Sequence, residues 1–299
     1  MADYKYCSHP QPYFFLLFSP LEKDLRKTRK ILSPNQKSIT MSFPTDITSK
    51  YPSLNKFNDD NYVVSHDGRE IALLKHVYSH PALDELRGSP SGILRVMDGF
   101  AAQQDFLINI GPDKGGKVQR IIEEEKPTIL VELGGYVGYS AISFAETMRR
   151  AHGDTKQDLR LWSLEFDPLI ASIAMNLIDL AGLSDIVKVV VGSAADSIKR
   201  LHAEKKLTTI DFLFLDHVED LYVTDLKVCE NLSLLQPRSM VVADNVLRPG
   251  APQYREYVRQ HPRMESWSVK GVIIPGDYEV SSSYIICKLV FRSDLTITG

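Results

Sequence analysis

Acidic and amide residues follow two apolar segments in the second half of the chain. Asp216 comes directly after 210–215, and Asp244 and Asn245 come directly after 239–243. Because the carboxyl ends of parallel strands meet at one edge of a sheet, we expect these side chains to face one another. Two carboxylates and an amide oxygen suit Mg²⁺ better than zinc. The alternative is that these residues only cap helices and turn the chain; their occurrence at two strand ends favours the metal site.

A glycine-rich segment, Thr128–Ala141, carries a second candidate site. Apolar and β-branched residues lead to Glu132, three glycines follow, and Ser140 opens a helical pattern. This is the strand, turn and helix of a nucleotide-binding unit, without the Gly-x-Gly-x-x-Gly spacing of dinucleotide sites. A carboxylate at the strand end favours a ligand with hydroxyls or positive charge over one with phosphates. Taken alone, the segment is equally consistent with an ordinary turn.

A third acid, Glu165, ends the next strand-like segment, 159–165. In α/β nucleotide folds an acid at the end of the second strand holds ribose hydroxyls. Glu165 lies farther from the first strand than the usual spacing of roughly 20 residues, and a polar loop at 152–158 accounts for the excess.

These residues are positioned by alternating strand and helix patterns. Two helices, around 71–77 and 93–100, are expected to pack on the main domain, and 106–116 reads as a loop, either a connection or a lid, before a helix at 118–125. Pro262 is expected to end a short helix, and strand-like segments fill 267–291 around Pro275-Gly276. The predicted fold is therefore Rossmann-like α/β, a mostly parallel sheet with helices on both faces. Its five strands are expected at 128–133, 159–165, 186–191, 210–216 and 239–244. Its four main helices are expected at 141–150, 168–182, 193–202 and 221–235.

The composition of the 299 residues is that of an ordinary globular protein, with 43% hydrophobic and 24% charged residues. A net charge of −3 provides no basic field for nucleic acid or an acidic membrane. Three cysteines without metal-ligand spacing indicate a reducing compartment. The apolar run 13–18 is too short to span a bilayer and lacks the flanks of a secretory signal. We therefore predict a cytosolic (cytoplasmic) protein with neither nucleic-acid nor membrane partners.

The domain organisation follows from a change in pattern near residue 60. Residues 1–60 are rich in lysine, proline, serine and asparagine and are predicted to be a disordered extension rather than a nucleic-acid-binding arm. Met41 could equally be the true start. Residues 61–299 are predicted to form a single domain, which we expect to act as a monomer.

Five short motifs resemble catechol O-methyltransferase, most closely its fungal branch, and the likeness runs in register from about residue 70 to 290. They are Glu132-Leu-Gly-Gly-Tyr-Val-Gly-Tyr-Ser140, Asn109-Ile-Gly111, Phe214-Leu-Asp-His217, Ala243-Asp-Asn-Val246 and Pro249-Gly250. The resemblance implies a seven-stranded class I methyltransferase with extra N-terminal helices. It also implies that the enzyme transfers a methyl group from S-adenosylmethionine to a hydroxyl of a small aromatic diol such as a catechol, with Mg²⁺.

The resemblance also assigns roles to individual positions. Glu165 matches the ribose-binding acid, and Ala194 and Ala195 replace a serine-glutamine pair beside adenine. Pro249 matches a wall of the substrate slot, and Glu279 matches a catalytic carboxylate that binds the second hydroxyl. The metal positions are Asp216, Asp244 and Asn245, and the cofactor positions are Asn109, Ile110, Glu132, Gly134, Tyr136, Ser140, Glu165, Phe166, Ala194, Asp216 and His217.

One position departs from the family in a way that bears on catalysis. The family has His-Trp-Lys-Asp where this chain has His217-Val-Glu-Asp220, so Glu219 replaces the catalytic lysine and Val218 replaces an aromatic wall residue. A second wall tryptophan appears as Phe106. Glutamate, with a pKa near 4.3, is a weak base for a phenol near 10.

Three interpretations of Glu219 stay open: it is a substitute catalytic base, the metal alone suffices, or the substrate differs. A surface role for this side chain also stays open. At the level of the whole chain, the alternative to an enzyme is a catalytically weakened protein that binds S-adenosylmethionine and metal in a regulatory role. A nicotinamide oxidoreductase is disfavoured because its glycine motif is absent.

Overall fold

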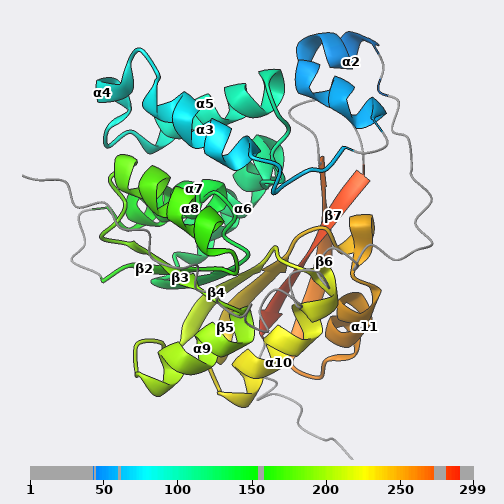
Figure 1. Cartoon of the computed structure of the whole chain (residues 1–299). Helices are drawn as coiled ribbons and strands as arrows, with labels where there is room; N and C mark the ends of the chain where they lie inside the picture. Colours follow the sequence, from blue (N-terminus) through cyan, green and yellow to red (C-terminus); the bar gives the residue numbers. More distant parts are fainter. Residues whose placement is uncertain (1–42, 44, 60–61, 154–157, 273–280, 290–299) are drawn as a thin grey trace, which may run out of the picture. The chain divides into compact units, whose positions relative to one another are not determined.

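In the computed structural model, residues 43, 45–59, 62–153, 158–272 and 281–289 are described, although the side chains of 248, 249 and 281–289 are not. All of them belong to one compact unit, Ser42–Gly299. Its centre is a seven-stranded sheet in the order β3-β2-β1-β4-β5-β7-β6 (Figure 1). The predicted Rossmann-like α/β class is confirmed.

The first five strands are parallel and the last two run antiparallel to their neighbours. Leu133 of β1 pairs with Leu215 of β4, and Leu215 pairs with Ala243 of β5. The residues that follow these three strand ends are therefore neighbours in space. The strands are β1 Ile129–Leu133, β2 Arg160–Glu165, β3 Val187–Val191, β4 Ile210–Leu215, β5 Leu235–Ala243, β6 Met264–Val272 and β7 Ser281–Leu289.

Helices cover both faces of the sheet (Figure 1). Alternate strand residues point to opposite faces, so Leu130 and Phe212 enter one apolar cluster while Val131 and Leu213 enter the other. The first cluster includes side chains of α6 Gly111–Glu125, α7 Tyr139–His152 and α8 Pro168–Leu180. The second includes side chains of α9 Ala194–Ala203, α10 Tyr222–Asn231 and α11 Pro252–Gln260.

The expected N-terminal helices are present as α3 Arg69–Tyr78 and α5 Pro90–Gln103, with the short α4 Leu83–Leu86 between them. The structure also places α2 Thr45–Lys50 and η1 Pro52–Asn58 inside the stretch that the sequence assigned to a disordered extension. These residues are ordered because their apolar side chains pack together. Tyr51, Leu54 and Phe106 form a small cluster bordered by Phe57.

Several predicted element boundaries were wrong. Helix α6 begins at Gly111 and takes up half of the expected loop 106–116, because Pro112 suits a first helical turn and the following Lys114 and Gly115 are buried. The expected helix 221–235 is divided into η2 Glu219–Leu221 and α10, and β5 already begins at Leu235. Residues 246–250 form a single π-helical turn, η3 Val246–Gly250. Within the described ranges, no helix is both long and apolar enough to cross a membrane.

Candidate active site

The turn after β1 is held against the end of β4 by glycines. Gly134 has φ +93°, and a Cβ built on it would lie 2.4 Å from the carbonyl oxygen of Asp216. Gly138 has φ +85°, and a Cβ built on it would lie 3.2 Å from the Cβ of Ala174 in α8. The positive φ disfavours a side chain at both positions, and at Gly134 the backbone of Asp216 leaves no space for one. The turn can therefore lie directly beside the residues that follow β4.

Glu132, near the end of β1, is a fully buried carboxylate with an incomplete set of hydrogen bonds. Its Oε2 accepts a 2.6 Å hydrogen bond from the Ser163 hydroxyl, but Oε1 has no hydrogen-bond partner in the part of the chain that the structure describes. Burial raises the pKa of Glu132 to about 7, although the hydroxyls of Ser140 and Ser163 work against this rise. A buried acceptor without a donor fits a ligand that brings one.

The other buried polar atoms without a partner among the described residues include Asn109 Nδ2, just before α6, and His217 Nδ1, which follows β4. The opposite atoms of both side chains are fixed. Asn109 Oδ1 accepts from the Gly111 amide at 3.0 Å, and His217 Nε2 lies 2.8 Å from Asp225 Oδ2. Since native proteins pair most buried polar groups, these two atoms indicate places where a ligand completes the hydrogen bonding.

Glu165 and Tyr136 tie the turn to its surroundings. Glu165 accepts hydrogen bonds from the backbone amides of Tyr136 at 2.8 Å and Asp167 at 2.9 Å. Burial raises the pKa of Glu165 above its usual range. The Tyr136 hydroxyl donates to Glu70 of α3 at 2.9 Å, a contact that the sequence did not predict. The accessory helices thus help to fix the turn.

The other predicted cofactor positions differ in exposure. Ile110 and Ser140 are buried. Phe166 is 63% exposed, so the described residues do not enclose its ring. Ala194 is the first residue of α9 and packs at the edge of the second apolar cluster.

Asp216, Asp244 and Asn245 come together at the ends of β4 and β5, as predicted. Asn245 has φ +58°, and its backbone amide donates to Asp244 Oδ1 at 2.7 Å. Its Nδ2 lies 3.5 Å from Asp216 Oδ1. Burial and the negative charge of Asp244 raise the pKa of Asp216 well above its usual range, while Lys114 opposes the rise. We call these three residues the acid rim.

The acid rim already holds a cation. The buried Lys114 ammonium of α6 pairs with Asp244 Oδ2 and lies 3.2 Å from Asn245 Oδ1. Sequence reasoning missed Lys114 because it placed this residue in a loop, and one lysine among glycines carries no distinguishing signal. The described residues contain no cluster of three or more His, Cys, Asp or Glu side chains suited to a metal. The rim, with two carboxylates and one amide oxygen, fits Mg²⁺ by its oxygen donors and by already holding a positive charge.

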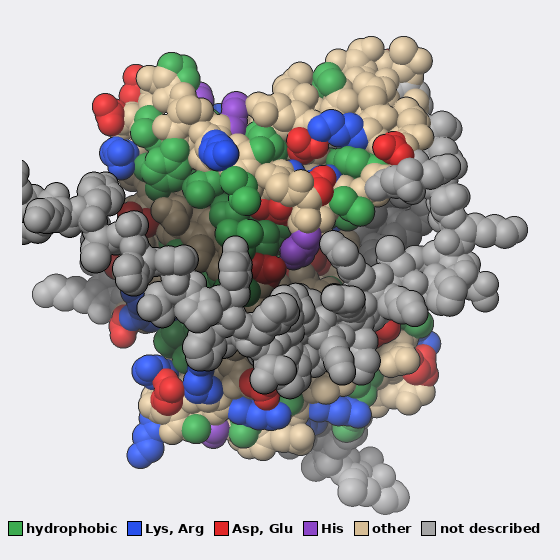
Figure 2. Space-filling view, viewed as in Figure 1, with side chains coloured by type: hydrophobic (Ala, Val, Ile, Leu, Met, Phe, Trp, Pro, Cys, Tyr) green, Lys and Arg blue, Asp and Glu red, His purple; other side chains and the backbone are tan. Residues whose placement is uncertain are grey.

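Figure 2 shows acidic side chains and a histidine together in a hollow bordered by hydrophobic side chains. A hollow with polar groups at its base and apolar walls is typical of small-molecule sites.

Comparison of the chain with known proteins shows which family it belongs to. Residues 92–264 match the family model described as O-methyltransferase. The chain belongs to the O-methyltransferase family. It is 35% identical to the catechol O-methyltransferase of Bos taurus, over 66% of this chain and 68% of that protein. It is also 36% identical to a probable O-methyltransferase of Mycobacterium tuberculosis, over 68% of this chain and 83% of that one.

Among solved structures, this O-methyltransferase is similar in fold to the O-methyltransferase of Bacillus cereus in complex with SAH. The TM-score is 0.55 at 19% identity, over 82% of this chain and 98% of that chain. The resemblance to catechol O-methyltransferases seen in the sequence is confirmed, and so is the predicted enzyme class, an S-adenosylmethionine-dependent O-methyltransferase.

Glu219 opens η2 next to the acid rim of this O-methyltransferase. Burial raises the pKa of Glu219, and the charges of Asp220 and Asp244 add to the rise. The surface interpretation of this side chain is therefore disfavoured. Val218 is 45% exposed.

Of the other expected substrate-site residues, Phe106, Pro249 and Glu279, the structure describes the side chain of Phe106 alone. Phe106 is buried with its ring 5.3 Å from that of Phe57, so it belongs to the N-terminal apolar cluster. Glu279 and the side chain of Pro249 lie outside the described residues.

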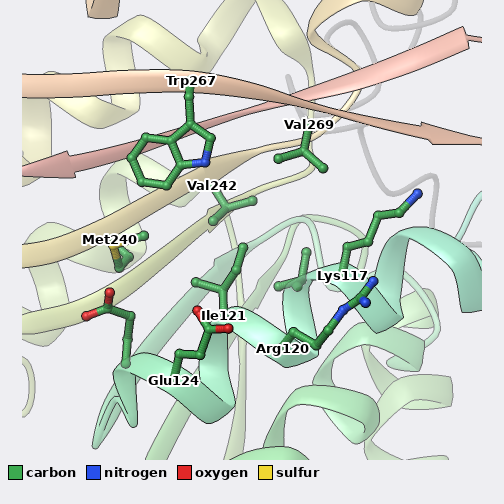
Figure 3. A pocket seen from close by; sticks show the side chains of 10 residues that line it. Lys117, Arg120, Ile121, Glu124, Met240, Val242, Trp267 and Val269 are labelled. Carbon is green, nitrogen blue, oxygen red and sulfur yellow. The ribbon is translucent and has the colours of Figure 1, made fainter.

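A separate pocket lies between α6 and strands β5 and β6 (Figure 3). Trp267 stands over Met240 and Val242, while Lys117 and Arg120 project from the helix. None of the predicted site residues lines this pocket. It is thus distinct from the candidate active site.

Proposed function

We propose that this O-methyltransferase moves the methyl group of S-adenosylmethionine to a hydroxyl of a catechol-like aromatic diol, with Mg²⁺ at the acid rim. One observation carries the proposal. Unpartnered buried atoms of Glu132 and His217 belong to residues beside a glycine turn that touches the acid rim at Asp216. An unpartnered atom of Asn109 lies just before α6, the helix that carries Lys114 to the same rim. Buried polar atoms that still need hydrogen-bond partners therefore lie close to a site that holds a cation.

The residues around the turn fit the polar groups of the methyl donor. Glu132 Oε1 offers a buried negative charge to the ammonium of the methionine part, because a cation in that place would relieve the cost of burying the carboxylate. Glu165 keeps acceptor capacity for ribose hydroxyls after its two backbone bonds, since a carboxylate has about four acceptor sites. Asn109 and His217 supply the remaining polar contacts.

Asp216, Asp244 and the amide oxygen of Asn245 would hold Mg²⁺. When bound, the metal would lower the pKa of a chelated hydroxyl and fix its direction. The relatives named catechol O-methyltransferase support the diol as the substrate class. The positions of the described residues support a site that orients both reactants, which is most of what an activated sulfonium methyl requires.

Glu219 would then accept the proton of the attacking hydroxyl. The oxygen would form a bond to the methyl carbon as the sulfur–carbon bond breaks, with the electron pair left on the sulfur, and the proton would pass to the Glu219 carboxylate. Burial raises the pKa of Glu219 in the metal-free protein, which makes it a stronger base than an ordinary glutamate there, whereas a bound Mg²⁺ would oppose this rise.

The second candidate function is a weakened, regulatory binder of the same ligands. It is favoured only by the replacement of the family's lysine with Glu219. Such a protein would bind S-adenosylmethionine and transfer no methyl group at any pH. The cytosolic location, the monomeric state and the single domain over 61–299 stay predictions.

The test is methyl transfer from labelled S-adenosylmethionine to a panel of catechols, with Mg²⁺ and with chelator, for the unaltered protein and Glu219→Lys. Chelator-sensitive transfer by the unaltered protein is the expected result. Transfer that appears only in Glu219→Lys would support the binder instead. Transfer that is unchanged by chelator would overturn the role of the metal.

A further inference from the structure

The acid rim contains its own cation, and this bears on how a metal enters. The side chain of Lys114 is 3% exposed and that of Asp244 is 1% exposed. Burying a carboxylate without a counter-charge is costly, so this ion pair stabilises the rim when no metal is bound. A second carboxylate, Asp216, adds negative charge at this place, since its Oδ1 lies 3.5 Å from Asn245 Nδ2.

The oxygen atoms that hold Lys114 are the ones that a metal would need. Its ammonium contacts Asp244 Oδ2 and Asn245 Oδ1, which belong to two of the three proposed ligands. A divalent cation bound to the same oxygens would stand within a few ångströms of the ammonium, where two positive charges repel strongly in a partly buried site. The two cations therefore exclude each other.

We infer that Lys114 is a built-in competitor of the divalent metal: Mg²⁺ binds the acid rim by displacing the Lys114 ammonium from Asp244 and Asn245. This inference rests on the proposed function, since it takes Mg²⁺ as the metal. It makes Lys114 a positioning residue, which keeps the rim assembled without metal and sets the affinity with which metal is taken up.

Lys114 belongs to α6, a helix that also borders the predicted binding site of the methyl donor. Asn109 and Ile110 directly precede this helix, and Asn109 accepts a hydrogen bond from Gly111, the first helical residue. Displacement of Lys114 therefore acts on the helix whose N-terminal end carries part of the cofactor site.

The experiment is calorimetric titration of the folded, full-length protein with Mg²⁺ alone, for the unaltered chain and two variants. Lys114→Met removes the competing charge, and we expect it to bind Mg²⁺ at least about tenfold more tightly. Lys114→Arg keeps the charge and can pair with a carboxylate through two hydrogen bonds, so we expect it to bind Mg²⁺ at least about fivefold more weakly.

Lys117→Met is the matched control. Lys117 lies one turn further along α6 and pairs with Asp113 at 2.7 Å, outside the acid rim. Its loss should leave Mg²⁺ affinity within about twofold of the unaltered protein, because the charge that it removes is partly exposed and screened.

Each outcome decides the matter. Unchanged or weaker Mg²⁺ binding by Lys114→Met, with normal binding by the unaltered protein, would overturn the inference and leave the proposed function intact. If Lys114→Met folds only when Mg²⁺ is present, the inference is supported. If Lys114→Met does not fold with or without Mg²⁺, the test is made with Lys114→Arg. A Mg²⁺ affinity of Lys114→Arg equal to that of the unaltered protein would refute the inference. Binding by neither the unaltered protein nor Lys114→Met would refute the metal in the proposed function as well.

Discussion

Replacing Glu132 with glutamine should remove a loss of stability that the ligand-free protein suffers as the pH rises. The carboxyl is buried, and its pKa rises from 4.5 to about 7 on folding. Between these values the unfolded chain releases a proton that the folded protein retains, so stability falls as pH rises from about 4.5 to 7 and stays low above that range. Glutamine does not titrate in this range, so the Glu132→Gln protein should not lose stability in this way as the pH rises.

The magnitude follows from the two pKa values. At pH 8.5 the whole difference between the pKa values of 4.5 and about 7 applies, which corresponds to about 3 kcal/mol, whereas at pH 5 less than about 1 kcal/mol is lost. Relative to Glu132→Gln, the unaltered protein should therefore lose about 2 to 3 kcal/mol between pH 5 and pH 8.5. Any cost of the unpaired amide hydrogens of glutamine is independent of pH and cancels in this comparison.

The assay is urea unfolding of both proteins at pH 5 and pH 8.5 without ligand. Glu85→Gln, at an exposed position of α4, serves as the control and should show no comparable difference. A pH-dependent difference below about 1 kcal/mol for Glu132→Gln would refute the argument from burial. The same variant should bind S-adenosylmethionine at least about tenfold more weakly, because the charge that destabilises the free protein is the one that holds the ligand.

Three further predictions concern two residues of the site and one buried ion pair near the N-terminal helices. Gly134→Ala should cost more than about 2 kcal/mol in urea unfolding, because the added Cβ meets the Asp216 carbonyl oxygen and φ is +93°; a cost near zero would contradict this. Glu219→Gln should lower kcat at least about tenfold with little change in S-adenosylmethionine affinity, and its pH–rate profile should lose the acidic limb; an unchanged profile would exclude Glu219 as the base. Arg69→Met should destabilise the protein by about 3 kcal/mol or more in thermal and urea unfolding, because the buried guanidinium pairs with Asp67 and donates to the Phe106 carbonyl; a loss below about 1 kcal/mol would refute the role of this network.

The sequence determined the arrangement of the acids. Apolar segments are recognised as parallel strands because they alternate with helical patterns, and five such segments alternate in this way here. Once that alternation is accepted, Asp216, Asp244 and Asn245 must lie at one edge of the sheet, and the structure places them there. Glycine spacing likewise predicted the tight turn after β1, because few other residues tolerate its backbone conformation.

The contacts between distant elements were decided by tertiary structure. The local pattern predicted a loop at 106–116, whereas in the structure its second half, from Gly111, begins α6, and this helix carries Lys114 into the acid rim. The sequence separation of 130 residues between Lys114 and Asp244 leaves no local signal. The tether from Tyr136 to Glu70 is another contact of this kind.

Side-chain chemistry at the site also depended on the fold. From sequence, Glu219 was a weak base at its ordinary pKa, and Glu132 was a carboxylate at the end of a strand. Burial raises both pKa values because a carboxylate loses more solvation than its neutral form does. Residue types and spacing thus fixed which groups meet at the edge of the sheet, while three-dimensional packing fixed their solvation, their partners and therefore their reactivity.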